Sequence, residues 1–193
     1  SEFHLYNLDG EAAIHYGGDS VQFDPGSAAL MILDSDTQRQ RQPNTEDFVW
    51  FVQLVEMLPQ LDAQSTAMVP ADVPLEIGDV YRLYLALNYM TKPIVTGAFR
   101  TDTWWTMRDL LIAVAGSEEA LAAKPIAIFD VCPSPPLKWS NLTCQNMIDC
   151  ARSGIPSELV SMPLAGATSP VTLAGAVVQH TAECLSGVTI CQL

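Results

Sequence analysis

The chain repeats one pattern four times: a short apolar run followed by a stretch with helical periodicity. The apolar runs begin at residues 61, 94, 126 and 159, so successive starts are separated by 33, 32 and 33 residues. The runs cover residues 61–69, 94–99, 126–131 and 159–164, and the helical stretches cover 76–90, 103–115, 142–153 and 170–193. Strand and helix alternating at this spacing are typical of βαβ units, in which helices connect parallel strands. The sequence therefore predicts an α/β fold with a parallel sheet.

Residues at the expected helix ends support this interpretation. Asn44 is a predicted N-cap for a helix that precedes the first unit, with Asp47 at its third position and Pro59 at its end. The later helices have their own predicted signals: Thr101 or Asp102, Asn141 and Ser169 as N-caps, Pro170 as a first helical residue, and Gly154 as a left-handed terminator.

Residues 1–43 differ from the repeats. Two short stretches, 3–9 and 12–16, are each followed by glycine, which predicts a β-hairpin. We therefore expect a small antiparallel, β-rich appendage at 1–43 and four βα units at 44–193.

The number of repeats leaves two architectures open. A closed (β/α)₈ TIM barrel has eight units and typically about 250 residues, so four units would form half of one. A doubly wound open sheet of four strands would also accommodate the length. However, no GxGxxG or Walker sequence follows the first run. We favour half of a TIM barrel.

Composition narrows the class of function. Lys and Arg number 9 against 22 Asp and Glu, a formal charge of −13, so no basic surface is available for nucleic acid. The five cysteines contain no CxxC pair and no Cys/His pair has ligand spacing, so we expect reduced thiols and no metal site. With no signal sequence or membrane-spanning run, a cytoplasmic protein is expected. The first residue is Ser1, which indicates a cloning scar or a cut inside a longer protein.

Candidate site residues follow the apolar runs, because βα barrels bind ligands at the carboxyl ends of their strands. Asp130 ends the third run and is a candidate base, ligand anchor or cation partner; a structural hydrogen bond or a helix cap is the alternative. Gln64 and Thr96, at the first two runs, are candidate substrate-binding residues.

Three residues before the last helix, Gly166, Thr168 and Ser169, form a candidate anion site. Free amides at a helix N-terminus would favour a carboxylate or phosphate there, although a tight turn with an ordinary N-cap is the alternative. Trp139 could face a cationic ligand, or it could pack a helix against the sheet. Cys132 and His180 are interpreted as structural residues.

Four segments add a resemblance to a known family. HLYNLDGEAAIHY, QFDPGSAALMILD, LDAQSTAMVPADVPLEIGDVYRLYLALNYMTKPIVTGAF and SMPLAGATSPVTLAGAVVQHTAE resemble the trimethylamine methyltransferase family over nearly the entire chain. The resemblance implies a (β/α)₈ barrel that moves a methyl group from trimethylamine, glycine betaine or a related amine to the Co(I) of a corrinoid (cobalamin) carried by a partner protein. Members of the family are longer, and the pyrrolysine of the trimethylamine branch is expected beyond the last residue of this chain.

We expect Asp130 and Trp139 to face the cationic end of such a substrate, and Thr168 and Ser169 to face a betaine carboxylate. Two other functions stay open. The chain could be a non-catalytic module that binds a zwitterion or a corrinoid, or a small open-sheet protein unrelated to corrinoids. No membrane partner is expected, and a homo-oligomer is left open.

Overall fold

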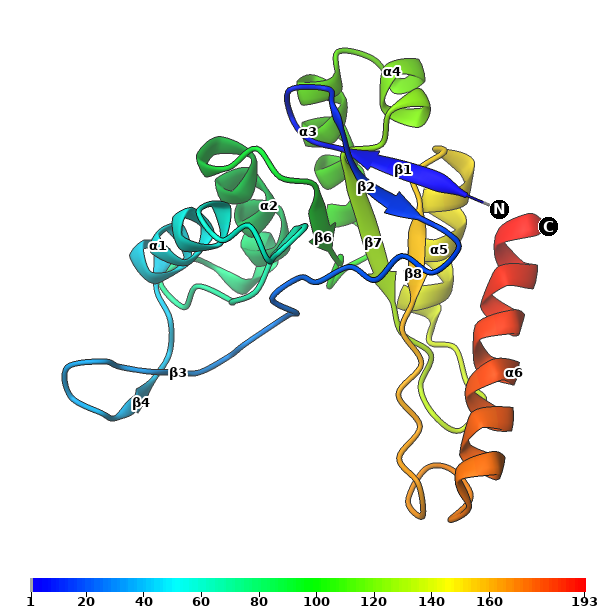
Figure 1. Cartoon of the computed structure of the whole chain (residues 1–193). Helices are drawn as coiled ribbons and strands as arrows, with labels where there is room; N and C mark the ends of the chain where they lie inside the picture. Colours follow the sequence, from blue (N-terminus) through cyan, green and yellow to red (C-terminus); the bar gives the residue numbers. More distant parts are fainter. Residues whose placement is uncertain (1) are drawn as a thin grey trace. The chain divides into compact units, whose positions relative to one another are not determined.

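The computed structural model describes residues 2–193, and their parallel sheet has the strand order β5-β6-β7-β8 (Figure 1). The strands are β5 (Gln64–Ser65), β6 (Ile94–Thr96), β7 (Ala127–Val131) and β8 (Ser157–Leu159). β5 pairs in parallel with β6, and β7 pairs in parallel with β8. The predicted parallel sheet is confirmed, and its spatial order follows the order of the sequence.

The chain divides into two compact units, of which the first extends to Ile128 and the second is Phe129–Leu193. The first unit contains α1 (Thr45–Glu56), a 3₁₀ turn (Leu75–Ile77), α2 (Gly78–Tyr89), α3 (Thr103–Ala115) and α4 (Glu118–Ala123). The second contains α5 (Asn141–Arg152) and α6 (Leu173–Gln192). A helix follows each strand of the sheet, as the repeat predicts. The sequence pattern missed α4, because six residues are too few to show a helical period. The predicted boundary at residue 43 stays a prediction.

The helix starts show where local sequence signals were sufficient. Asn44 caps α1 in a reciprocal capping box with Asp47, as predicted. The predicted cap of α5 is wrong by one residue, because the Ser140 hydroxyl, not Asn141, accepts the Thr143 N–H at 3.1 Å.

The fourth strand also differs from the prediction. β8 ends at Leu159, where the predicted apolar run 159–164 begins. Its three residues are Ser, Glu and Leu, all half-buried, so hydrophobicity alone did not identify the strand. Most of the predicted run lies in the loop after it.

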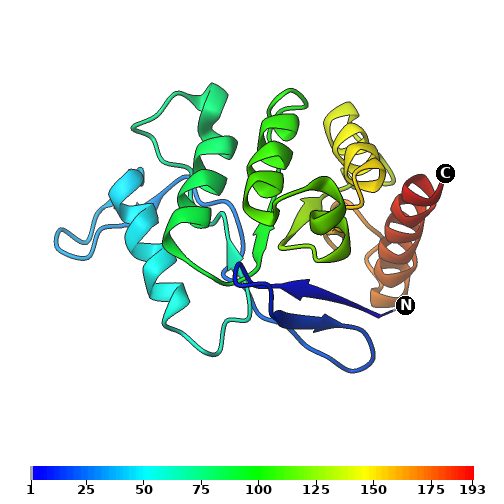
Figure 2. The same ribbon diagram turned by 90° about the horizontal axis from the view of Figure 1, so that it is seen from above.

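A hairpin of two antiparallel strands, β1 (Phe3–Tyr6) and β2 (Ala12–Tyr16), lies in the first unit and donates backbone hydrogen bonds to the Thr91 and Pro125 carbonyls, which precede β6 and β7. Leu5 and Ile14 form a buried cluster with Ala63, Val95 and Ile128. Figure 2 shows this hairpin on the side of β5 and β6 that lies away from α1 and α2. A second, short antiparallel pair joins β3 (Ile32–Leu33) to β4 (Gln40–Arg41). No helix of the described residues is long and apolar enough to cross a membrane.

The hairpin should contribute to stability mainly through Leu5, which is fully buried. Leu5→Ala should lower the free energy of unfolding by about 2–5 kcal/mol, since it removes core methyl groups and leaves a cavity. Leu30→Ala is the matched control, because 66% of the Leu30 side chain is exposed. Its effect should stay within about 0.5 kcal/mol. Urea unfolding of both variants measures the difference, and equal losses would contradict this assignment of the core.

Candidate functional site

The strand ends of the first unit carry buried polar side chains that form hydrogen bonds inside the protein. Gln64 donates from Nε2 to the Val52 carbonyl of α1 at 3.2 Å. The Thr96 hydroxyl lies 3.1 Å from that of Thr66, and all of these polar side chains are fully buried. Gln64 and Thr96 thus have partners inside the protein, and their role in substrate binding stays a prediction.

Arg82 of α2 is a buried cation that the sequence pattern did not reveal. Its Nη1 donates to the Thr66 carbonyl at 2.6 Å, and its guanidinium carbon lies 4.4 Å from the centre of the Phe99 ring. Burial lowers the pKa of Arg82 to about 10, against the opposing effect of the Asp79 charge, so the side chain stays protonated at neutral pH. The cation is therefore held beside the loops that follow β5 and β6.

Asp79, three residues earlier on α2, is equally buried. Its Oδ2 accepts the Phe99 N–H at 2.8 Å and the Thr103 hydroxyl at 2.5 Å. The carboxylate therefore ties the loop after β6 to two helices. Asp79 and Arg82 lie on one helix face among apolar residues, a spacing that could have revealed them in the sequence.

In the second unit, the structure places a second carboxylate beside Asp130. Asp130 of β7 is in register with Glu158 of β8, so neighbouring parallel strands present both side chains on the same face. Both residues are half-buried. Burial raises the pKa of the Cys132 thiol, and the charges of Asp130 and Glu158 raise it further, which keeps the thiol protonated at neutral pH. Glu158 was missed because it precedes the apolar run used to locate the strand.

The loop that contains Gly166, Thr168 and Ser169 closes on itself. The amides of residues 167, 168 and 169 all lie 3.0 Å from the Leu164 carbonyl, to which they donate, and the Gly166 N–H donates to the Ser169 carbonyl. The predicted helix start at this loop is wrong, because α6 begins at Leu173 and Thr172 caps it. The amides are thus occupied within the loop, and any ligand contact here would come from side chains.

Trp139 packs against α6. Its indole N–H donates to the Ser186 hydroxyl at 2.9 Å. A Cβ added to Gly187 would lie 3.0 Å from the Trp139 ring and 2.8 Å from Leu159, so the helix can approach both side chains only with glycine there. Trp139 therefore packs against a helix, which is one of the two roles that the sequence allows, while its contact with a cationic ligand stays a prediction.

Glu183 of α6 is a second buried acid that was not predicted, with 1% of its surface exposed. It accepts the Leu137 N–H at 2.9 Å, the Ser161 hydroxyl at 2.5 Å and the Gln179 amide at 3.0 Å. Burial raises the pKa of this carboxyl, but the three donors outweigh burial and hold the pKa below its ordinary value. The sequence signal that could have identified Glu183 is that it is the one charged residue in the largely apolar segment after residue 170.

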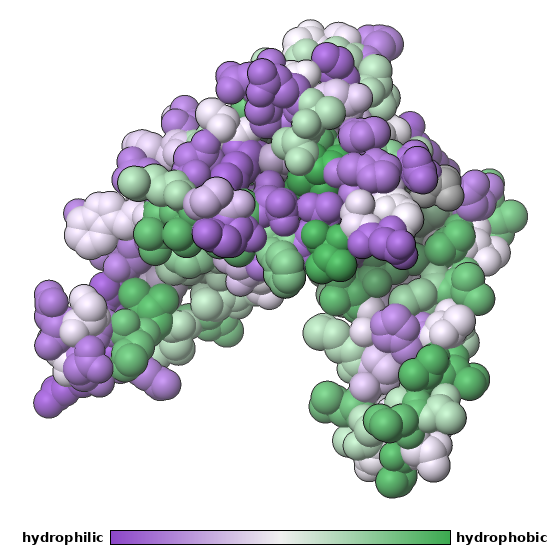
Figure 3. Space-filling view, viewed as in Figure 1, coloured by the Kyte–Doolittle hydropathy of each residue, from purple (hydrophilic) through white to green (hydrophobic). Residues whose placement is uncertain are grey.

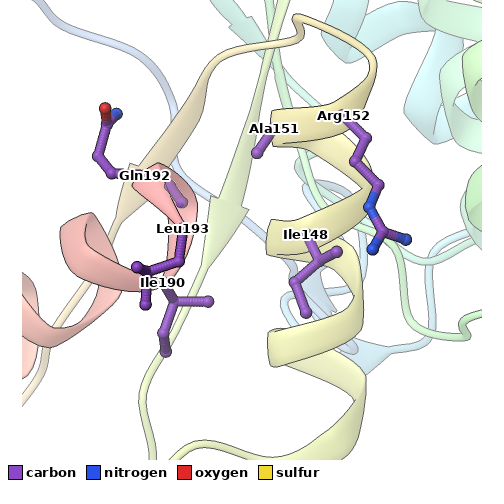
Figure 4. Close-up of a pocket in the computed structure, with 7 residues that line it drawn as sticks. Ile148, Ala151, Arg152, Ile190, Gln192 and Leu193 are labelled. Carbon is purple, nitrogen blue, oxygen red and sulfur yellow. The ribbon is translucent and has the colours of Figure 1, made fainter.

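A cleft of about 420 Å³ also lies in the second unit, between the C-terminal ends of α5 and α6 (Figure 4). The residues that line it are Ile148, Ala151, Arg152, Ile190, Cys191, Gln192 and Leu193. Because helices of βα units run antiparallel to their strands, this cleft lies away from the strand carboxyl ends. It contains none of the candidate residues. Among residues 2–193, no group of three or more His, Cys, Asp and Glu side chains is arranged to hold a metal ion.

Comparison with known proteins identifies the family. The family model described as trimethylamine methyltransferase (MTTB) matches residues 1–193. The chain belongs to this family. It is 29% identical to the trimethylamine methyltransferase MttB of Desulfitobacterium hafniense over 177 residues, which cover 92% of this chain and 36% of that protein.

Two further relatives extend the comparison. The trimethylamine methyltransferase MttB of Methanosarcina barkeri is 46% identical over 87 residues, covering 45% of this chain and 18% of that protein. The glycine betaine methyltransferase of Desulfitobacterium hafniense is 24% identical over 193 residues, covering 100% of this chain and 40% of that protein. The chain thus spans at most about two fifths of the length of these family members.

The start of α6 can be tested with two hydroxyl deletions. Thr172→Ala should lower the free energy of unfolding by about 1 kcal/mol, because it removes the acceptor of the Gly175 N–H. Ser169→Ala should cost nothing or stabilise slightly, since the Ser169 hydroxyl is buried without a hydrogen-bond partner among the described residues. Urea unfolding compares the two, and a larger loss for Ser169→Ala would restore the cap predicted from the sequence.

The lowered pKa of Glu183 predicts a pH dependence of stability. The folded state binds the ionised form more favourably, so Glu183 stabilises the fold above its ordinary pKa of 4.5, and this contribution disappears as the pH falls through the lower folded-state pKa. Glu183→Gln should therefore be less stable than the wild type at neutral pH, with the difference shrinking in acid. Unfolding free energies measured from about pH 7 to about pH 3 provide the test, and a constant difference would contradict it.

Proposed function

We propose that the protein carrying this sequence moves a methyl group from a methylated amine, of the trimethylamine or glycine betaine class, to the Co(I) of a corrinoid on a partner protein. The observation that carries this proposal is the family match over all 193 residues. Relatives named for both amines align with the chain, so the class of substrate is supported and the choice between the two amines is not.

The strand order supports a barrel as the scaffold. A doubly wound sheet reverses its strand order at a switch point, whereas β5 to β8 continue in one direction without reversal. We therefore propose that the four βα units form half of a (β/α)₈ barrel, with the substrate at the strand carboxyl ends.

The acidic pair Asp130–Glu158 suits a cationic substrate. The quaternary ammonium of glycine betaine cannot donate a hydrogen bond, so attraction to nearby negative charge is the main polar interaction available to it, and protonated trimethylamine carries the same positive charge. Two half-buried carboxylates on neighbouring strands supply that charge in a partly desolvated place. We propose that Asp130, with Glu158, attracts the substrate and orients the methyl group for transfer.

The reaction needs no proton transfer from this pair. The C–N bond of the substrate breaks and its electron pair stays on nitrogen, while an electron pair of Co(I) forms the new bond to the methyl carbon, which gives methyl-Co(III) and an amine with one methyl group fewer. Because the substrate loses its positive charge as the amine leaves, carboxylates that favour the cation bind the ground state at least as strongly as the transition state. The pair should thus act mainly on substrate binding.

The other predicted residues have supporting roles in this proposal. The side chains of Thr168 and Ser169 are assigned to the carboxylate of a betaine, and Gly166 allows their loop to turn, with a φ of +81°. Gln64 and Thr96 are assigned an indirect role: their hydrogen bonds to Val52 and Thr66 fix the strand ends beside which the substrate would bind. The corrinoid is a substrate carried by its own protein, so we assign no residue of this chain to hold it. The five free thiols suit a reducing cytoplasm.

Removing charge from the pair tests the proposal. In the protein as its gene encodes it, Asp130→Asn and Glu158→Gln should each raise KM for the amine about tenfold, with a smaller effect on kcat. Asp19→Asn, which removes an exposed carboxylate of the first unit, is the matched control and should change neither constant. Methylation of a Co(I) corrinoid, followed by absorbance, measures both constants.

Two outcomes would overturn parts of the proposal. Wild-type KM in both variants would remove Asp130 and Glu158 from the site. Binding of trimethylamine or glycine betaine without methylation of any Co(I) corrinoid would replace the methyltransferase by a binding module.

A further inference from the structure

The buried carboxylate of Glu183 requires an explanation beyond helix packing. Exposed apolar side chains occur along much of α6, among them Leu173, Val177, Val178 and Leu185, and Figure 3 shows apolar surface over this helix. Glu183 is buried instead, although burying an ionised carboxylate costs several kcal/mol unless hydrogen bonds replace its water. On α6 apolar side chains are thus exposed while the carboxylate is buried, the reverse of the usual arrangement, which indicates that the Glu183 side chain has a specific role.

The contacts of Glu183 show what that task is. Its Oε1 accepts the backbone N–H of Leu137, in the loop between β7 and α5. Its Oε2 accepts the hydroxyl of Ser161, two residues after the end of β8. One carboxylate therefore joins the two loops that leave the carboxyl ends of neighbouring strands, the strands that carry Asp130 and Glu158.

Neighbouring side chains of α6 extend this connection. Gln179, one turn before Glu183, donates to both the Glu183 carboxylate and the Thr168 carbonyl, at 3.0 and 2.7 Å. One turn in the other direction, Ser186 accepts the Trp139 indole N–H and donates to the Glu183 carbonyl. The loop residues reached in this way, Thr168 and Trp139, are both predicted from the sequence to face the substrate.

The first unit contains a simpler form of the same arrangement. Asp79 accepts a loop N–H, from Phe99, and one hydroxyl, from Thr103. Both of those donors lie after a single strand, β6. Glu183 differs in that its two donors come from the loops of two different strands, so it fixes one loop relative to the other.

We propose that Glu183 is a positioning residue: it holds the loops after β7 and β8 together against α6, and so places Trp139 and Thr168 around the substrate. This inference rests on the proposed function. Loops ordered in advance lower the cost of reaching a reactive geometry, and a displacement of about 1 Å can reduce the rate substantially. Loss of Glu183 should therefore lower kcat, whereas loss of Asp130 or Glu158 should raise KM.

The experiment uses Glu183→Gln in the complete protein, which keeps the size of the side chain and removes its charge. We expect kcat to fall about tenfold with KM changed less than threefold. Ser161→Ala, which frees only the loop after β8, should give a smaller loss, and the double variant should lose less than the product of the two. Thr181→Val, at an exposed position of the same helix, is the matched control and should leave kcat unchanged.

Hydrogen–deuterium exchange of the same variants separates positioning from general stability. In Glu183→Gln, the gain in exchange rate at residues 132–140 and 160–169 should exceed that at β7 and α5, whose protection falls only with the unfolding free energy of the variant. Wild-type kcat, or exchange that rises equally across the second unit, would overturn the inference. A wild-type protein that methylates no corrinoid would overturn the proposed function instead, and faster exchange confined to the two loops would then still support the loop-holding contact of Glu183.

Discussion

Parallel strand pairing is the constraint on which the rest of this structure depends. Because β5 pairs in parallel with β6, and β7 with β8, each connecting helix must return the chain to the starting edge of the sheet. The carboxyl ends of paired strands then lie side by side, and the loops that leave them become neighbours. Asp130 and Glu158 lie side by side for this reason alone, although they are 28 positions apart in the chain.

The loops themselves lack regular hydrogen bonding, and buried acids on the helices replace it. Asp79 and Glu183 each exchange the hydration of a carboxylate for a loop N–H and a hydroxyl. Such a group is expensive to bury and more expensive to leave without its partners, so it favours one loop position strongly. Arg82 has a similar role with the opposite charge, because its guanidinium donates a hydrogen bond to the Thr66 carbonyl in the loop after β5.

The two kinds of acid differ in a way that suits the proposed chemistry. Glu183 is almost completely buried and its oxygens are occupied by donors of the second unit, which leaves it a structural task. Asp130 and Glu158 are half-buried on the strands, where a cationic amine could approach them. One unit of this chain thus contains both the pair proposed to attract the cation and the residue proposed to order the loops around it.

The sequence by itself determined the parallel α/β fold, the helices that follow the strands and the capping box at Asn44, because these depend on local periodicity and on cap residues. It also determined the family, because family membership depends on the similarity of long sequence segments. It identified Asp130 but not its neighbour Glu158, since strand register depends on contacts between distant segments. It also missed Asp79, Arg82 and Glu183, and it placed the start of the last helix at Ser169 rather than Thr172. Only the tertiary structure decided these points, because the burial of a charge, and the choice among several hydroxyls as a cap, depend on which donors and acceptors the folded chain brings within hydrogen-bonding distance.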